Sequence, residues 1–214
     1  MKKLIKNLIN FHKKAEKLKT TTRHSWLSDS KRQESVAEHS WMLCLLAVIL
    51  EDKLKKKVNL LKILKMLLIH DLAESVTGDI PVHEVSARQN RKYESEKKVF
   101  KKLVKNLPNK NAKEIISLWE EFEENKTKEA KFANSLDKME AIMQHNLADI
   151  STFDQGDFDV HPYYKDEYFY YDSFIRAFKD VVDIQSMEKI IEAKAAHRIE
   201  AKHLEKYRRL KNKK

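Results

Sequence analysis

The string LLIHDLAESVTGDIP, residues 67–81, places an adjacent imidazole and carboxylate, His70 and Asp71, at the end of an apolar helical stripe. Two ionisable groups at the edge of a core need hydrogen-bonding partners or a function, because burying them unpaired is costly. Gly78 and Pro81 end this helix or its last irregular turn. Taken alone, the pair also fits a simple helix cap, so the rest of the chain must decide between the two interpretations.

Two further helical patterns are interrupted in the same way. ESVAEHSW, residues 34–41, places His39 in the first turns of a helix that begins at Ser35, a residue with capping-box spacing. In NSLDKMEAI, residues 134–142, Asp137 interrupts an apolar stripe. Three helices can thus direct two imidazoles and two carboxylates towards one centre. Such a mixed nitrogen and oxygen set suits Mn²⁺, Co²⁺, Fe²⁺ or Zn²⁺ without selecting among them.

The composition favours an all-α fold. The 214 residues include two glycines and three prolines, too few turn residues for a sheet protein. No repeat or Ser/Pro-rich boundary divides the chain, which predicts a single domain over residues 1–214. The expected metal-site core covers about residues 20–150, and an aromatic loop and a basic helix follow over 151–214.

Apolar periodicity and capping residues predict the individual elements. Asn59 is expected to cap the helix that ends near His70. A polar, aperiodic loop is expected over Thr20–Gln33, and an ordered loop over the Asp-, Phe- and Tyr-rich segment Ser151–Tyr171. Beyond the helix from Ser35, the others are expected at about residues 4–19, 60–70, 88–106, 111–124, 128–150 and 184–210.

Charge and cysteine content limit the possible partners. The formal net charge is +10, but residues 190–214 alone carry nine Lys and Arg against three Glu. The remaining chain is too weakly basic to predict a phosphate-tracking surface. The single cysteine, Cys44, lies in an apolar run and the first residues lack a secretory pattern, which predicts a cytoplasmic protein. No membrane association is expected.

The order His39, His70-Asp71, Asp137 resembles the HD-domain superfamily of metal-dependent phosphohydrolases. ESVAEHSW, IHDLAESVTGDIP and EAKFANSLDKME resemble in particular the bacterial 5′-deoxynucleotidases and their eukaryotic HD-domain-containing relatives, over about residues 20–150. The resemblance implies an all-α HD-domain helical bundle that hydrolyses deoxyribonucleoside 5′-monophosphates to nucleoside and phosphate. It also implies one divalent metal ion per subunit, Mg²⁺ included among the candidates, held by these four residues, and a homodimer.

The resemblance assigns catalytic roles to two more carboxylates. Glu74 lies one helical turn after His70 on the same face and matches the family's proposed catalytic glutamate, which moves a proton. Asp79 follows Gly78 and matches an aspartate that assists at the active centre. The alternative interpretation of Glu74 is a solvated helix residue, and that of Asp79 is the cap of a turn.

Substrate binding carries over less directly. Arg23 and Trp26 in TRHSWL resemble the Arg and Trp that hold phosphate and sugar or base in these nucleotidases. In the bacterial form the two are adjacent, whereas here His24 and Ser25 intervene. Arg32 is a second candidate for phosphate contact.

Several alternatives stay open. The motifs define a metal and not a pocket, so the substrate can be another phosphate ester, such as a cyclic nucleotide, a nucleoside triphosphate or an alarmone. A non-catalytic regulatory or nucleic-acid-binding helical module is the alternative from another class.

No Walker or nucleophile-elbow motif is present. Between Asp71 and Asp137 the only histidine is His83, which favours one metal over a di-iron centre. Five other histidines are expected on the surface: His12, His24, His145, His197 and His203. The positions of His83 and His161 are left undecided.

Overall fold

The computed structural model describes residues 1–161 and 163–212 of the chain. Its α-helices are α1 (Lys2–Ala15), α2 (Val36–Leu50), α3 (Leu60–Ile69), α4 (Glu74–Thr77), α5 (Ala87–Asn90), α6 (Lys92–Val104), α7 (Asn109–Glu124), α8 (Lys128–Leu147), α9 (Gln155–Val160), α10 (Ser173–Glu192) and α11 (Ala201–Lys211). Two short strands, β1 (Thr22–Trp26) and β2 (Gln33–Ser35), pair antiparallel. The all-α class expected from the composition is confirmed.

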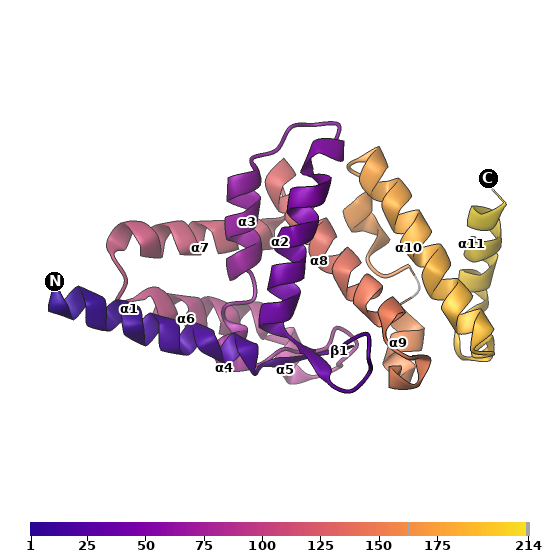
Figure 1. The fold of residues 1–214 in the computed structure, drawn as a ribbon, viewed down its shortest axis with the longest axis horizontal. Helices are drawn as coiled ribbons and strands as arrows, with labels where there is room; N and C mark the ends of the chain where they lie inside the picture. The colour runs from indigo at the N-terminus through magenta and orange to yellow at the C-terminus, as the bar shows by residue number, and fades with distance from the viewer. Residues whose placement is uncertain (162, 213–214) are drawn as a thin grey trace.

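Helix α8 runs through the centre of the molecule (Figure 1), and α2, α3, α7 and α10 pack against it. Helices α1, α6 and α7 extend to one side, while α11 lies at the opposite end beside α10, so the two termini are far apart. The main apolar core lies between α2, α3, α8 and α10 and includes Leu43, Ile63, Leu67, Phe132 and Val182. The helices that carry the predicted ligands are therefore those that share the largest core.

The predicted helix starts at Ser35 and Asn59 are confirmed. The Ser35 side chain accepts a hydrogen bond from the Glu38 backbone N–H, and the Glu38 carboxylate accepts one from the Ser35 backbone N–H, which forms a capping box. The Asn59 side chain accepts from the Lys62 backbone at the start of α3. Gly78 has a φ of +73°, as its place after the helical segment predicts, and the chain turns there before Asp79.

Two expectations about the elements are wrong. The loop expected over Thr20–Gln33 contains β1, because β2 supplies backbone partners that a single-segment pattern does not reveal. The one helix expected over 184–210 is two, α10 and α11. Helix α10 ends at Glu192, and Lys194 just after it adopts a left-handed φ of 58° before α11 begins. The segment Ser151–Tyr171 is ordered as expected but contains α9 and a 3₁₀ turn. Pro162 in that segment and the final two lysines of the basic tail lie outside the described residues.

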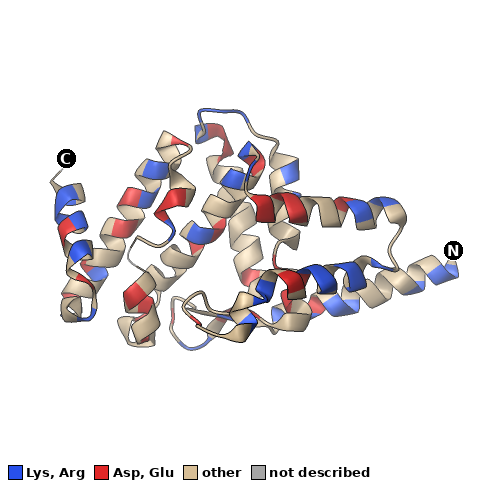
Figure 2. Ribbon diagram, turned by 180° about the vertical axis from the view of Figure 1, so that it is seen from behind, with Lys and Arg blue, Asp and Glu red and all other residues tan. Residues whose placement is uncertain are grey.

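The basic C-terminal helix is partly neutralised by contacts within the chain. Figure 2 shows Lys and Arg concentrated on α11 near the C-terminus, in contrast to the mixed charges of the central helices. Lys206 pairs with Asp166, and Lys211 Nζ lies 3.0 Å from an oxygen of Glu188. Within the described part of the chain, no helix combines the length and apolar character needed to cross a membrane.

Candidate metal centre and active site

Side chains from three helical segments meet at one buried centre. His39 belongs to α2, His70 ends α3 with Asp71 directly after it, and Asp137 belongs to α8. His39 Nε2 lies 3.1 Å and His70 Nε2 3.8 Å from Oδ1 of Asp137. His70 Nε2 is 3.0 Å from Oδ2 of Asp71. The structure thus brings together all four residues that the sequence proposes as ligands.

Outer contacts fix which atoms face this centre. His39 Nδ1 is 2.5 Å from Glu140 Oε2, and His70 Nδ1 is 2.8 Å from the backbone oxygen of Leu67. With each Nδ1–H donated outwards, each Nε2 lone pair is directed inwards, as in histidines that ligate metals. Although it lies 3.0 Å from Asp71 Oδ2, the buried His70 Nε2 has no partner with the geometry of a hydrogen bond. Two imidazole nitrogens and two carboxylates in this arrangement fit a divalent metal ion.

A cavity of about 350 Å³ opens beside this centre. Its walls include Asp71 and Asp137 together with three other residues that the sequence analysis selects, Arg23, Glu74 and Asp79. The aromatic segment Ser151–Tyr171 also contributes to the wall, through Tyr164 and Tyr168. The cavity is large enough for a phosphate ester with part of its organic group.

Glu74 is almost fully buried at the start of α4. Lys92, the first residue of α6, donates to Glu74 Oε1 at 3.2 Å, while Oε2 is buried without a hydrogen-bond partner. Burial and the nearby carboxylates of Asp71 and Asp79 raise the pKa of Glu74 well above its ordinary value, although Lys92 opposes them. A buried carboxyl with one free oxygen is suited to hold or transfer a proton.

Two cationic side chains contact the ligand set: Lys138 on α8, whose Nζ lies 2.5 Å from Asp137 Oδ2, and Arg23 on β1. Arg23 Nη1 donates to Asp71 Oδ2 at 3.2 Å, and its Nε lies 3.7 Å from Glu34. Burial opposes the charged form, but the carboxylates of Asp79 and Asp71 raise the pKa of the guanidinium above its ordinary value. Arg23 is therefore a permanent positive charge on the cavity wall, where an anionic group can reach it.

The other two substrate-binding candidates do not reach the cavity. Arg32 is exposed and pairs with Glu38, the residue that completes the capping box of α2. Trp26 is half-buried at the end of β1, where its backbone oxygen accepts a hydrogen bond from Gln144, and it is not part of the cavity wall. The expectation that Arg32 and Trp26 contact substrate is therefore not supported by their positions.

Several residues around the centre are not among those predicted from the sequence. Glu140 is three residues after Asp137 on α8, so helical spacing could have identified it. Glu34 is buried beside Arg23, and burial with the nearby Glu140 raises the pKa of Glu34 to about 7. Lys92 has no sequence signal, because only the tertiary packing of α6 beside α4 brings it to Glu74.

The expectation that His24 and His145 are surface residues is wrong, since both line the cavity. His203 is also buried, whereas His12 and His197 are exposed as expected. The two undecided histidines, His83 and His161, line the cavity as well. Helical periodicity cannot reveal this, because these cavity-lining side chains come from β1, an irregular segment, α8 and the end of α9.

The family profile described as "HD domain" matches residues 15–175. The chain belongs to the HD-domain family. It is 35% identical over 144 residues to a 5′-deoxynucleotidase HDDC2 from Dictyostelium discoideum, which covers 64% of this chain and 75% of the relative. The human 5′-deoxynucleotidase HDDC2 is 31% identical over 141 residues, covering 65% of this chain and 67% of the relative.

Solved structures agree with this family membership. A crystal structure described as a predicted metal-dependent phosphohydrolase from Magnetospirillum magnetotacticum superposes with a TM-score of 0.74 at 26% identity and covers 87% of this chain and 94% of its own. PH0347 protein from Pyrococcus horikoshii gives 0.57 at 26% identity, covering 87% and 98%. These findings confirm the resemblance, the HD fold and the assignment as a metal-dependent phosphohydrolase.

Proposed function

We propose that this HD-domain protein hydrolyses deoxyribonucleoside 5′-monophosphates to the nucleoside and inorganic phosphate. The observation that carries the proposal is the convergence of His39, His70, Asp71 and Asp137 beside a cavity that also holds Glu74 and Arg23. Relatives that are about one-third identical are named 5′-deoxynucleotidases, which supports the substrate class. The whole chain is proposed to act as one domain.

We assign the four convergent side chains as the ligands of one divalent ion. Such an ion would neutralise phosphate oxygens and lower the pKa of the attacking water. Arg23 is placed to pair with a phosphate oxygen and to orient the phosphorus for attack. In the overall reaction, water oxygen bonds to phosphorus, the bond from phosphorus to the 5′ oxygen breaks, and a proton reaches that oxygen.

Glu74 is the residue proposed to move this proton. Its unpaired Oε2 can take a proton from the attacking water or give one to the departing 5′ oxygen, while Lys92 holds Oε1 in place. Asp79 lines the same cavity and is proposed to orient water or the leaving group.

The test is phosphate release by metal-stripped protein after separate addition of Mn²⁺, Co²⁺, Fe²⁺, Mg²⁺ or Zn²⁺. The substrate panel contains deoxyribonucleoside and ribonucleoside 5′-monophosphates, 3′-monophosphates, cyclic nucleotides, triphosphates and an alarmone. We expect metal-dependent release with the highest kcat/KM on deoxyribonucleoside 5′-monophosphates. A preference for another ester would leave the assignment as a hydrolase intact and change the assigned substrate. No phosphate release from any ester would contradict the proposal.

Substitution Arg23→Ala is expected to weaken substrate binding. Loss of the proposed charge-assisted contact to phosphate should raise KM by roughly 10- to 100-fold, with a smaller fall in kcat. Steady-state kinetics on a deoxyribonucleoside monophosphate measure this split. The matched control is Arg209→Ala on the exposed face of α11, which should change neither constant. An unchanged KM in Arg23→Ala would remove Arg23 from the substrate site.

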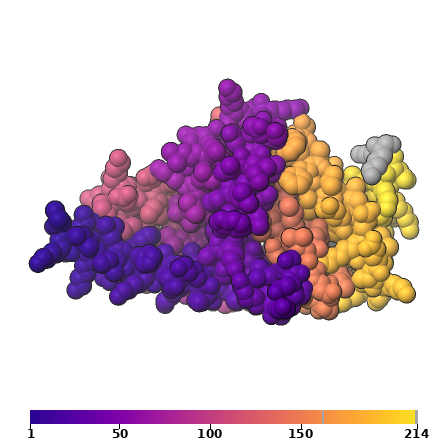
Figure 3. Space-filling view, in the orientation of Figure 1, coloured from indigo at the N-terminus to yellow at the C-terminus, as the bar shows by residue number. Residues whose placement is uncertain are grey.

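We also propose a homodimer formed through α2 and α3. Trp41, Leu45 and Val48 form an exposed stripe on α2, and Leu61 and Leu68 are exposed on the adjacent α3. Figure 3 shows the face that these two helices present, with α1 beside them. Large exposed apolar residues gathered on neighbouring helices are typical of an interface between proteins.

Light scattering after size exclusion tests this interface. The unmodified chain should have the mass of a dimer, and Leu45→Lys should shift it to the monomer mass because a buried lysine opposes association. Val181→Lys on α10, which replaces another exposed apolar residue, should leave the dimer intact. A monomer mass for the unmodified chain would contradict the proposal.

A cytoplasmic location is likewise proposed. Cys44 is a free, half-buried thiol, and it is the only cysteine of the chain, so no disulfide within the chain is available for an oxidising compartment. Fluorescence of a tagged full-length chain in its source cell would test this location.

A further inference from the structure

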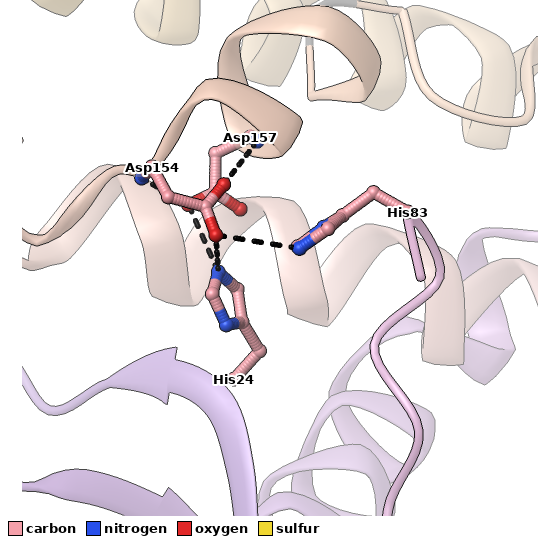
Figure 4. Close-up of side chains that lie close together, drawn as sticks. All are labelled: His24, His83, Asp154 and Asp157. Atoms are coloured by element: carbon pink, nitrogen blue, oxygen red, sulfur yellow. Dashed lines mark hydrogen bonds and ion pairs between the residues drawn. The ribbon is translucent and has the colours of Figure 1, made fainter. Parts of the chain in front are cut away.

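A second group of four metal-ligating side chains, three of which line the cavity, shares no residue with the first centre. His24 comes from β1, His83 from the irregular segment between α4 and α5, and Asp154 and Asp157 from the start of α9. Figure 4 shows the two imidazoles pointing at the two carboxylates. One ligand atom from each residue lies within 4.8 Å of the others. Three segments distant in sequence therefore place two nitrogens and two oxygens around one point.

We propose that His24, His83, Asp154 and Asp157 bind a second divalent transition-metal ion, with Zn²⁺ the best match. Imidazole and carboxylate together are a common donor set for Zn²⁺, and ligand distances of about 2.0–2.1 Å place tetrahedral donor atoms roughly 3.3 Å apart. The donor atoms here are spaced similarly: His24 Nε2 is 3.0 Å from Asp157 Oδ2, and His83 Nε2 is 3.4 Å from Asp154 Oδ2.

The two carboxylates are held in position before any ion arrives. Asp154 Oδ1 accepts from the Asp157 backbone at 3.0 Å, and Asp157 Oδ2 accepts from the Asp154 backbone at 2.9 Å, which forms a capping box at α9. Asp154 Oδ2 is not used by this box and lies 3.7 Å from His24 Nε2 and 3.4 Å from His83 Nε2. Fixed ligands lower the entropy cost of binding an ion.

Gly156, one of two glycines in the chain, allows His83 to reach this group. A Cβ at this position would lie 2.4 Å from Cδ2 and 2.5 Å from Cγ of the His83 ring. The imidazole therefore packs directly against the backbone of α9 because residue 156 has no side chain. An alanine there would push His83 away from Asp154 without removing any ligand.

The surrounding charges leave the two carboxylates without a permanent cation. Across residues 1–161 and 163–212, the ion-pair partners of Asp154 and Asp157 are all histidines, namely His24, His83 and His145. Burial lowers the pKa of His145 to about 4, so this imidazole is neutral at physiological pH, and its Nδ1 is buried without a hydrogen-bond partner. A bound divalent ion would supply the missing positive charge.

An ion bound by this second group would affect the cavity that lies beside the first centre. His24 directly follows Arg23, so an ion bound here would anchor the strand that presents the guanidinium. It would also join β1 and the His83 segment to α9 and cancel the negative charges of Asp157 on the cavity wall and of Asp154 beside it. We assign this ion a positioning role, separate from any ligand role of His39, His70, Asp71 and Asp137.

Metal stoichiometry tests the proposal without relying on activity. The full chain is stripped with a chelator, dialysed, titrated with Zn²⁺ by calorimetry, and analysed for bound zinc by mass spectrometry. We expect two equivalents for the unmodified chain, and one for the double variant His83→Gln/Asp154→Asn and for Gly156→Ala. The exposed-site control His12→Ala should retain two. Circular dichroism verifies that each variant is folded. Because the Asp154 side chain is half-exposed, the double variant should disturb the fold less than Gly156→Ala does.

The variant Asp71→Asn separates this proposal from the proposed function. It should lose the first equivalent and retain the one that depends on His83. A single equivalent in the unmodified chain that disappears in Asp71→Asn would overturn the second site and leave the hydrolase intact. Two equivalents retained in both His83→Gln/Asp154→Asn and Gly156→Ala would also overturn it. No binding in the unmodified chain would contradict both sites.

Discussion

Substitution Asp71→Asn is expected to abolish phosphate release and binding at the first metal centre together. Asp71 Oδ2 lies 3.0 Å from His70 Nε2 and accepts a hydrogen bond from Arg23, so one carboxylate serves both the ligand set and the phosphate-facing cation. An amide of the same size is a far weaker ligand for a divalent ion. We expect kcat/KM to fall by at least about 10³-fold, measured by phosphate release at saturating Mn²⁺ alongside bound metal.

Asp52→Asn is the matched control, since Asp52 is an exposed aspartate that pairs with its neighbour Lys53. It should keep full activity and full metal content. If Asp71→Asn retained both metal and turnover while remaining folded, the assignment of the ligand set would be wrong.

Substitution Glu74→Gln should instead separate metal binding from turnover. Glu74 lies beside the ligand set but is not part of it, and its side chain pairs with Lys92. Replacing Glu74 should therefore leave the metal content unchanged. Glutamine keeps the shape of the side chain but cannot transfer a proton. We expect kcat to fall by about 10²- to 10⁴-fold with little change in KM. Steady-state kinetics together with metal analysis distinguish this outcome from that of Asp71→Asn.

Glu124→Gln, at the exposed end of α7, is the corresponding control and should behave as the unmodified enzyme. Loss of metal in Glu74→Gln would show that Glu74 is a ligand or holds the ligand set together. Unchanged kcat would remove Glu74 from proton transfer.

The core of the candidate site could be predicted because its residues interrupt simple helical patterns. His39, His70 and Asp137 each stand out as polar groups on apolar stripes, and the capping box at Ser35 fixes where His39 falls in its helix. Helices α2, α3 and α8 then share one core, so their polar interruptions meet. Local sequence rules are sufficient where a ligand lies on a regular helix, as His39 and Asp137 do, or directly follows one, as His70 and Asp71 do.

The second metal-ligating group could not be predicted in this way. His24 lies on a short strand that depends on pairing with β2, and His83 lies in an irregular segment. Asp154 and Asp157 follow a capping pattern of α9, but no local rule places that helix next to β1. The surface position of Arg32 could not be predicted either, because it depends on the ion pair with Glu38.

Metal binding by the four convergent side chains can be tested directly by anomalous diffraction at the manganese edge from crystals grown with Mn²⁺. We expect a peak about 2.0–2.3 Å from His39 Nε2, His70 Nε2 and carboxylate oxygens of Asp71 and Asp137. A manganese peak elsewhere with none among these four side chains, or electron density that shows His39 or Asp137 turned away from the His70-Asp71 pair, would contradict it.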